Sequence, residues 1–227
     1  HRDLHSFPTR RSSYLNAGIY DNMRRFIRYA LATNSGEIWT IFLAPFFGLP
    51  IPLLPIQILW VNLVTDGLPG LALAAEPEER DVMRRSPRRP QESVFAHGLG
   101  IHVIWVGLLM GALTIGTQAW FLSLGSAHWQ TMVFVVLSLS QLSNVLAVRS
   151  ERESFFAQGL FSNTPLLLAV IVAFILQMVT IYVPILNGIF KTTPLGAAEL
   201  AVALVISSMV FFAVEAEKWW RRRRAGR

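Results

Sequence analysis

Residues 60–69 read Trp60-Val61-Asn62-Leu63-Val64-Thr65-Asp66-Gly67-Leu68-Pro69. They lie inside an apolar run that is long enough to cross a bilayer as a helix. Asn62, Thr65 and Asp66 follow an i, i+3, i+4 spacing, so a helix would place their polar groups on one face. A carboxylate at bilayer depth is costly and typically marks an ion or proton pathway. The stretch therefore predicts a buried cation site.

Two helix breakers follow this carboxylate at once. Gly67 and Pro69 weaken the helix at a point where backbone carbonyls could serve as further ligands. We therefore expect this membrane helix to be unwound near Asp66. An unwound segment would also let the helix change its shape around an ion.

The composition places the chain among helical membrane proteins. Of its 227 residues, 53% are hydrophobic and 15% are charged, whereas about a quarter of an ordinary soluble domain is charged. The net charge of +6 comes from short basic clusters between apolar runs. That pattern is typical of membrane topology, so we expect no nucleic-acid partner. The chain has no cysteine, which excludes disulfides and disfavours soft metals such as copper(I).

The apolar runs predict an all-α, polytopic membrane helix bundle with six transmembrane helices. The expected spans are residues 22–47, 55–75, 97–122, 130–148, 165–186 and 197–218. Residues 1–17 are mostly polar and lack apolar periodicity. We interpret them as a non-homologous tail that precedes the transmembrane domain, either an assembly scar or a disordered basic segment. The transmembrane domain is then expected to cover residues 18–227.

The basic residues indicate the orientation of the bundle. One side of the membrane receives Arg24, Arg25, Arg28, the arginines between residues 80 and 89, Arg149, Arg152 and the basic residues between 218 and 227. The other side receives Lys191. The positive-inside rule therefore places both termini in the cytoplasm, which fits an even number of spans. We expect an integral membrane protein of a bacterial plasma membrane, with membrane lipid as a partner.

A second acid, Glu37, lies within the first expected span, three residues after Asn34. The proline-rich connection at residues 50–55 makes the first two spans antiparallel neighbours, and the fourth span adds Gln141. The candidate ligands are Asn34, Glu37, Asn62, Thr65, Asp66 and Gln141. All offer oxygen, which suits hard cations such as Ca²⁺. Alternatively, polar residues in such spans hydrogen-bond between helices, an interpretation that is stronger for Gln141 and Asn144 than for the acids.

Motifs for nucleotide hydrolysis are absent from this sequence. It contains no glycine-rich Walker loop and no Asp-Lys-Thr-Gly-Thr phosphorylation motif. It also has no polar segment long enough to form a nucleotide-binding domain. We therefore expect that this chain alone does not hydrolyse ATP.

The sequence resembles the P-type cation-transporting ATPases of the sarcoplasmic-reticulum-like calcium-pump branch. Residues 18–29 are similar to the stalk that leads into the family's fifth membrane helix, and Asn34-Ser35-Gly36-Glu37 resembles the calcium-ligand motif of that helix. Residues 59–69 resemble the sixth helix almost residue for residue, and residues 81–90 are similar to the cytoplasmic loop that follows. The resemblance extends from about residue 18 to the C-terminus and implies membrane helices five to ten.

The resemblance implies the ion-binding membrane part of an ATP-driven pump. Ca²⁺ would be the transported ion, with Mn²⁺ as an alternative, and ATP and Mg²⁺ would act in cytoplasmic domains that this chain lacks. The missing N-terminal half of the pump would be a partner, and its fourth helix, with Glu beside Pro, would supply further ligands. In this chain Asn34, Glu37, Asn62, Thr65 and Asp66 would coordinate the ion.

One departure from the resemblance concerns Gln141, which stands where two-site calcium pumps carry Glu. We therefore expect one Ca²⁺ per transport cycle. The same Gln occurs in Na⁺/K⁺-type pumps, which leaves a monovalent alternative open, although those pumps tend to carry a second Asp at the position of Thr65. A self-standing six-span channel or secondary transporter is another alternative, but the spans show no halves of inverted similarity. A membrane protein that only packs against or regulates a partner is the last alternative.

Overall fold

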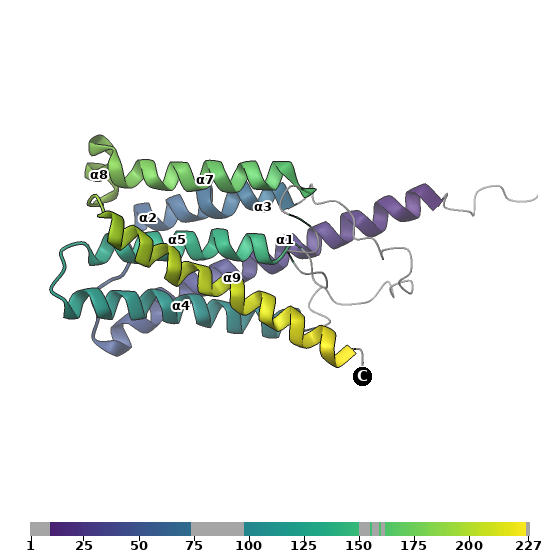
Figure 1. The fold of residues 1–227 in the computed structure, drawn as a ribbon, viewed down its shortest axis with the longest axis horizontal. Helices are drawn as coiled ribbons and strands as arrows, with labels where there is room; N and C mark the ends of the chain where they lie inside the picture. Colours follow the sequence, from purple (N-terminus) through teal and green to yellow (C-terminus); the bar gives the residue numbers. More distant parts are fainter. Residues whose placement is uncertain (1–9, 74–97, 150–154, 156–158, 160–161, 226–227) are drawn as a thin grey trace, which may run out of the picture.

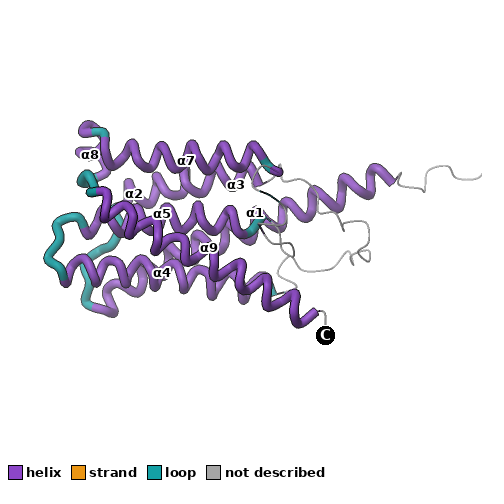
Figure 2. Tube along the Cα trace, in the orientation of Figure 1, coloured by secondary structure: helices purple, strands orange, loops and turns teal. Residues whose placement is uncertain are grey.

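The computed structural model describes residues 10–73, 98–149, 155, 159 and 162–225. Within these residues every regular element is a helix and no strand occurs, as the tube in Figure 2 shows. The elements are α1 Arg10–Leu43, the 3₁₀-helix η1 Ala44–Phe47, α2 Pro55–Trp60, the π-helix η2 Val61–Asp66, α3 Gly67–Leu73, α4 Leu99–Ser123, α5 Trp129–Ala147, α7 Thr164–Tyr182, α8 Pro184–Phe190 and α9 Ala197–Ala225. The all-α prediction is therefore confirmed for the described part of the chain.

Five helical stretches are long and apolar enough to cross a membrane. They are Pro55–Leu73, Leu99–Ser123, Trp129–Ala147, Thr164–Tyr182 and Ala197–Arg224, which correspond to the second to sixth expected spans. The first expected span, residues 22–47, falls on the C-terminal part of α1 and on η1. α1 does not meet the same criterion because Arg28, Asn34 and Glu37 lower its mean hydropathy. Its passage through the membrane stays a prediction. Residues 1–9 of the expected tail and residues 81–90 lie outside the described residues, and α1 already begins at Arg10.

The fifth expected span is not one continuous helix. α7 ends at Tyr182 and α8 begins at Pro184. Val183 between them has an extended backbone, with φ −91° and ψ 116°. Steric conflict with a following proline disfavours the helical conformation, so Pro184 forces this break. The prediction of a single helix over residues 165–186 is wrong at its C-terminal end.

The bundle is arranged around α5, whose side chains from Thr131 to Leu142 are all buried. α5 contacts α4, α7, α9 and η2, and it lies between the outer helices in Figure 1. The N-terminal part of α1 projects beyond the end of the bundle that also holds the C-terminus (Figure 1). Gln141 on α5 is therefore held deep in the bundle, on a helix that contacts η2.

The stretch around Asp66 is widened rather than unwound. α2, η2 and α3 follow one another without interruption, and residues Val61–Asp66 form a π-helix. Pro69 has no N–H to donate to the carbonyl of Thr65 four residues earlier. The hydroxyl of Tyr29 donates to that carbonyl instead, at 2.9 Å. The lost backbone hydrogen bond is thereby replaced, and the expected unwinding near Asp66 is not observed.

Two glycines allow α1 and α4 to approach closely. A Cβ atom on Gly107 would lie 2.2 Å from Ser35 Oγ, and one on Gly111 would lie 2.8 Å from the Cβ of Trp39. The two glycines are four residues apart and share one face of α4, as in the small-xxx-small contacts of membrane helices. This contact positions the segment of α1 that carries Glu37.

The variant Gly107→Ala is therefore expected to destabilise the bundle by about 1–3 kcal/mol, because a Cβ there overlaps Ser35 and the two helices must separate. Gly116→Ala on the same helix is the matched control, since a Cβ at that position meets no atom within 4 Å. Thermal unfolding of the purified protein in detergent measures both. Equal melting temperatures for the two variants would contradict the close contact.

A buried charged cluster joins three helices at the end from which α1 projects. His102 Nδ1 of α4 lies 2.7 Å from Arg28 Nη2 of α1 and 2.7 Å from Glu217 Oε2 of α9. Arg221 also pairs with Glu217. The cluster fixes α1 to α4 and α9 at this end, while the glycine contact fixes it further along. α4 is therefore joined to α1 at two levels, and α9 at this end.

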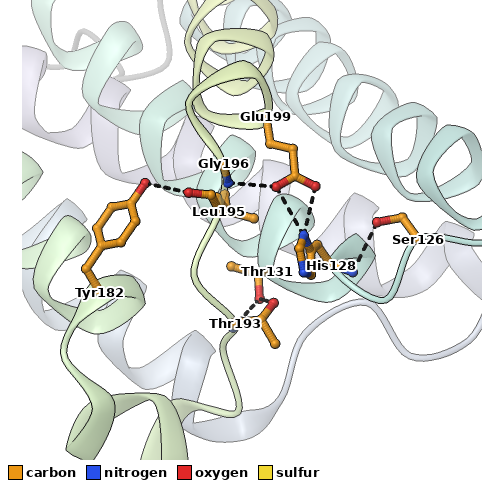
Figure 3. Close-up of polar contacts among 8 residues, drawn as sticks. All are labelled: Ser126, His128, Thr131, Tyr182, Thr193, Leu195, Gly196 and Glu199. Carbon is orange, nitrogen blue, oxygen red and sulfur yellow. Dashed lines mark hydrogen bonds and ion pairs between the residues drawn. The ribbon is translucent and has the colours of Figure 1, made fainter.

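Polar contacts also fix the opposite end of the bundle (Figure 3). Glu199 accepts a hydrogen bond from the backbone N–H of Gly196 at 2.9 Å, and its Oε1 lies 2.9 Å from Nδ1 of His128. The hydroxyl of Tyr182 donates to the carbonyl of Leu195 at 3.0 Å. These contacts connect the start of α9 to the N-terminus of α5 and the end of α7, so the core helices are held at both ends.

Candidate metal-binding site

Glu37 is the centre of the candidate site. Its side chain is buried, and each carboxylate oxygen accepts one hydrogen bond from an amide on another element. Asn62 Nδ2 of η2 donates to Oε2 at 2.9 Å, and Gln141 Nε2 of α5 donates to Oε1 at 2.9 Å. The partners are 25 and 104 residues away in sequence. The fold therefore brings three of the sequence-predicted residues into direct contact.

Gln141 extends this contact to Thr65. Its Oε1 lies 2.9 Å from Thr65 Oγ1, while its amide nitrogen donates to Glu37. The Thr65 hydroxyl has one proton to donate, and the carbonyl of Val61 at 2.8 Å is its other acceptor. Gln141 is completely buried. Its amide therefore bridges the first and second expected spans from the centre of the bundle.

Asp66 lies next to these residues and has a different partner. The Tyr29 hydroxyl of α1 is 3.1 Å from Asp66 Oδ1 and 2.9 Å from the carbonyl of Thr65. The other carboxylate oxygen, Asp66 Oδ2, is buried and has no hydrogen-bond partner among the described residues. A buried polar atom without a partner is costly, so this oxygen is well placed to meet a bound cation.

Tyr29 also borders the site and is not among the residues that the sequence predicts for it. It lies eight residues before Glu37 on α1, a spacing that places both on the same helix face. It is fully buried. A tyrosine in an apolar span gives no charge signal by itself. The signal that could have identified it is Pro69, which leaves a backbone carbonyl that needs another donor.

Tyr29→Phe is expected to lower the free energy of unfolding by about 1–3 kcal/mol, because it removes a buried hydroxyl whose one proton can be donated either to the Thr65 carbonyl or to Asp66 Oδ1. The matched control is Tyr182→Phe, which removes a hydrogen bond at a partly exposed site. Thermal unfolding in detergent compares the variants. A larger loss for Tyr182→Phe than for Tyr29→Phe would contradict the role assigned to Tyr29.

Asn34 is not brought together with the other candidates. Its side chain is exposed, and Nδ2 donates to the carbonyl of Ala30 on its own helix at 2.7 Å. Residues three apart on a helix differ by about 60° in direction, which places Asn34 toward the surface when Glu37 points inward. Asn62 is also exposed, although it reaches Glu37. The site is therefore open on the side of Asn34 and Asn62.

Asn144 lies one turn beyond Gln141 on α5 and is completely buried. Neither its amide nitrogen nor its amide oxygen has a hydrogen-bond partner among the described residues. The interhelical hydrogen bonding that the sequence suggested is therefore present for Gln141 and is not observed for Asn144.

The donor set suits a hard cation. Two carboxylates, two side-chain amides and a hydroxyl supply only oxygen ligands once each amide presents its oxygen. In the structure both amides point their nitrogens at Glu37, so a cation at this carboxylate requires the amide groups to rotate. Within the described residues no three His, Cys, Asp or Glu side chains form a group that could hold a metal ion. A cation bound at this place would meet two acids together with neutral oxygen donors.

A family model described as the C-terminus of cation-transporting ATPases matches residues 50–220. The chain belongs to this family. The match covers η2, with Asn62, Thr65 and Asp66, and α5, with Gln141. α1, with Tyr29, Asn34 and Glu37, precedes the matched residues.

Three relatives of this cation-transporting ATPase region are named calcium pumps. The chain is 44% identical to a calcium-transporting ATPase of Bacillus subtilis, over 86% of this chain and 22% of the relative. It is 37% identical to calcium-transporting ATPase 1 of Bacillus cereus, over 83% and 23%. It is 32% identical to an endoplasmic reticulum calcium ATPase of Aspergillus fumigatus, over 90% and 24%. The chain thus spans about a quarter of the length of these relatives.

Proposed function

We propose that this chain is the ion-binding part of the membrane domain of an ATP-driven Ca²⁺ pump. The observation that carries the proposal is the contact of Glu37 with Asn62 and Gln141, beside Asp66 with its unpaired buried oxygen. Two carboxylates supply two negative charges, which match one divalent cation, and the neutral oxygens complete a ligand set of the kind that Ca²⁺ prefers. The calcium-pump names of the three relatives support the same ion.

The proposed ligands are Glu37, Asn62, Thr65, Asp66 and Gln141, with Asn34 at the open side of the site. We propose that the pump carries one Ca²⁺ per cycle, because Gln141 contributes no charge to a second site. Mn²⁺ accepts the same oxygen ligands and is the closest competitor in chemical terms. The neutral amide of Gln141 also leaves Na⁺ or K⁺ as a second candidate, so the test includes monovalent ions.

The exposed surface around Asn34 and Asn62 supports a contact with other membrane helices of the same pump. Asn34 and Asn62 are surrounded along α1, α2 and η2 by exposed apolar side chains. Ile38 is 63% exposed, Leu59 61% and Leu63 68%. We propose that the N-terminal membrane helices of the pump cover this surface and supply the remaining ligands. ATP and Mg²⁺ would act in the cytoplasmic domains of that pump, and this chain alone is proposed to be inactive.

In the proposed mechanism α1 connects the cytoplasmic domains to the ligands. It is one uninterrupted helix from Arg10 to Leu43 and carries Glu37. A movement of α1 changes the distance between Glu37 and the amides of Asn62 and Gln141, and therefore the affinity for the ion. Binding on one side and release on the other follow from this difference in affinity between two states. The proposed orientation places both termini in the cytoplasm of a bacterial cell, with lipid around the bundle.

The decisive experiment uses the full-length pump that contains this chain, reconstituted into inside-out vesicles. ATP is expected to drive uptake of ⁴⁵Ca²⁺, and Mn²⁺ to compete for it. ATP-driven transport of Na⁺ or K⁺ without Ca²⁺ would establish the monovalent alternative. Ion flux that needs no ATP would establish the channel or secondary transporter and overturn the proposal.

A further inference from the structure

The C-terminal end of α9 combines aromatic and basic side chains in one short segment. Residues 219–224 read Trp219-Trp220-Arg221-Arg222-Arg223-Arg224. Trp219 is 49% exposed and Trp220 is 51% exposed. Exposed tryptophans of membrane proteins are enriched at the boundary between the hydrocarbon and the headgroups, where their amphipathic rings are stable.

The length of α9 places this segment at that boundary. α9 has 29 residues, which at the usual helical rise corresponds to about 43 Å. The hydrocarbon core of a bilayer is about 30 Å thick. The last two turns of α9 therefore extend past the hydrocarbon into the headgroup layer, at the end of the bundle where Figure 1 places the C-terminus.

Two of the arginines are held flat on the tryptophan rings. Arg223 Cζ lies 3.8 Å from the centroid of the Trp219 ring, and Arg224 Cζ lies 3.6 Å from that of Trp220. A guanidinium carries its N–H donors in its own plane, so a stacked guanidinium keeps its edge available for hydrogen bonds. Planar N–H donors of this kind match a phosphate group in a bidentate manner.

The acidic residues of the same helix are already engaged elsewhere. Glu215 forms an ion pair with Lys218. Glu217 pairs with Arg221 and lies 2.7 Å from His102. Among the described residues these two acids are therefore paired with other side chains, and the positive charges of Arg223 and Arg224 remain available to an external anion.

The outer face of α9 indicates what kind of anion this is. Val205, Phe212 and Trp219 are spaced seven residues apart and are 66%, 61% and 49% exposed. A seven-residue spacing keeps side chains on one helix face, so an apolar stripe runs along α9 to the stacked arginines. A phospholipid has the matching chemistry, because its acyl chain can lie along this stripe while its phosphate reaches the arginines.

We propose that Trp219, Trp220, Arg223 and Arg224 bind the headgroup of an anionic phospholipid in the leaflet at the C-terminal side, with an acyl chain along Val205 and Phe212. The rings fix the two guanidinium groups at headgroup depth, and the guanidinium edges bind the phosphate. This site is separate from the candidate cation site and does not depend on the transported ion.

The test measures binding of phosphatidylglycerol to the purified protein in neutral detergent, by native mass spectrometry and by the lipid-dependent rise in melting temperature. The double variant R223Q/R224Q is expected to bind phosphatidylglycerol about 30-fold more weakly, which corresponds to about fivefold for each arginine near an anionic surface. Without lipid it should melt at the wild-type temperature, because both side chains are exposed. The control Lys191→Gln removes an exposed positive charge outside this segment and should leave the affinity unchanged.

A second double variant, R223K/R224K, keeps the charge but loses the planar guanidinium groups. Its affinity is expected to fall between those of the wild type and R223Q/R224Q. Wild-type affinity in R223K/R224K would show that positive charge alone accounts for the binding, which would overturn the proposal. Unchanged affinity in R223Q/R224Q, an equal response to phosphatidylcholine, or the same stabilisation by inorganic phosphate alone would also overturn it.

Discussion

Replacing Asp66 with asparagine is expected to abolish Ca²⁺-dependent phosphorylation of the full-length pump that contains this chain. The substitution removes the carboxylate at the end of the π-helix and places an amide at the buried position of Oδ2. Loss of an outer-shell group near a metal typically weakens binding by about 10–100-fold, and Asp66 is proposed to contact the ion directly. We therefore expect a loss of more than about a hundredfold in Ca²⁺ affinity.

The measurement is the amount of phosphoenzyme formed from labelled ATP as the Ca²⁺ concentration increases. Glu199→Gln is the control, because Glu199 lies in the first turn of α9 and its partners, His128 and Gly196, are not among the proposed ligands. That variant should form phosphoenzyme at the wild-type Ca²⁺ concentration. Normal Ca²⁺-dependent phosphoenzyme in Asp66→Asn would refute the assignment of Asp66.

Glu37→Gln is expected to have an effect of similar size, with an additional consequence for the hydrogen bonds. Glu37 accepts from both Asn62 and Gln141. A glutamine at position 37 offers one acceptor and one donor group, so one of the two amide contacts is lost along with the charge. The apparent affinity for Ca²⁺ should fall by about a hundredfold.

A charge exchange between α1 and α5 tests this prediction further. The double variant Glu37→Gln with Gln141→Glu restores a carboxylate within hydrogen-bond distance of residue 37, because the two side chains are 2.9 Å apart. It should recover at least about tenfold in Ca²⁺ affinity relative to Glu37→Gln alone, since the total charge of the site is restored. An exchange variant no better than the single variant would show that these side chains do not share an ion.

The ligand types could be predicted from the sequence because charged and amide side chains are rare in apolar spans. Asp66, Glu37 and Gln141 were identified on this basis, and the structure brings Glu37 and Gln141 into contact. The family was also evident from residues 18–69, and the match over residues 50–220 confirms it. What sequence spacing could not give is the direction of each side chain. Asn34 therefore appeared equivalent to Glu37, although it is exposed.

The local helix geometry could not be predicted because it depends on contacts between elements. Pro69 indicated a weakened helix, and only the position of Tyr29 in the fold shows how the free carbonyl of Thr65 is satisfied. The close approach of α1 and α4 likewise depends on the packing of Gly107 against Ser35, which the sequence does not reveal. Pro184 is a local signal for the end of α7, because a proline disfavours helix in the residue before it. The uniform apolar character of residues 165–186 nevertheless favoured a single span.

The most direct test of the cation site is equilibrium binding of ⁴⁵Ca²⁺ to the purified full-length pump, for the wild type, Asp66→Asn and Glu37→Gln. We predict one Ca²⁺ bound per wild-type pump and loss of that ion in both variants. Retention of one tightly bound Ca²⁺ in either variant, with a folded protein by thermal unfolding, would contradict the site built on Glu37 and Asp66.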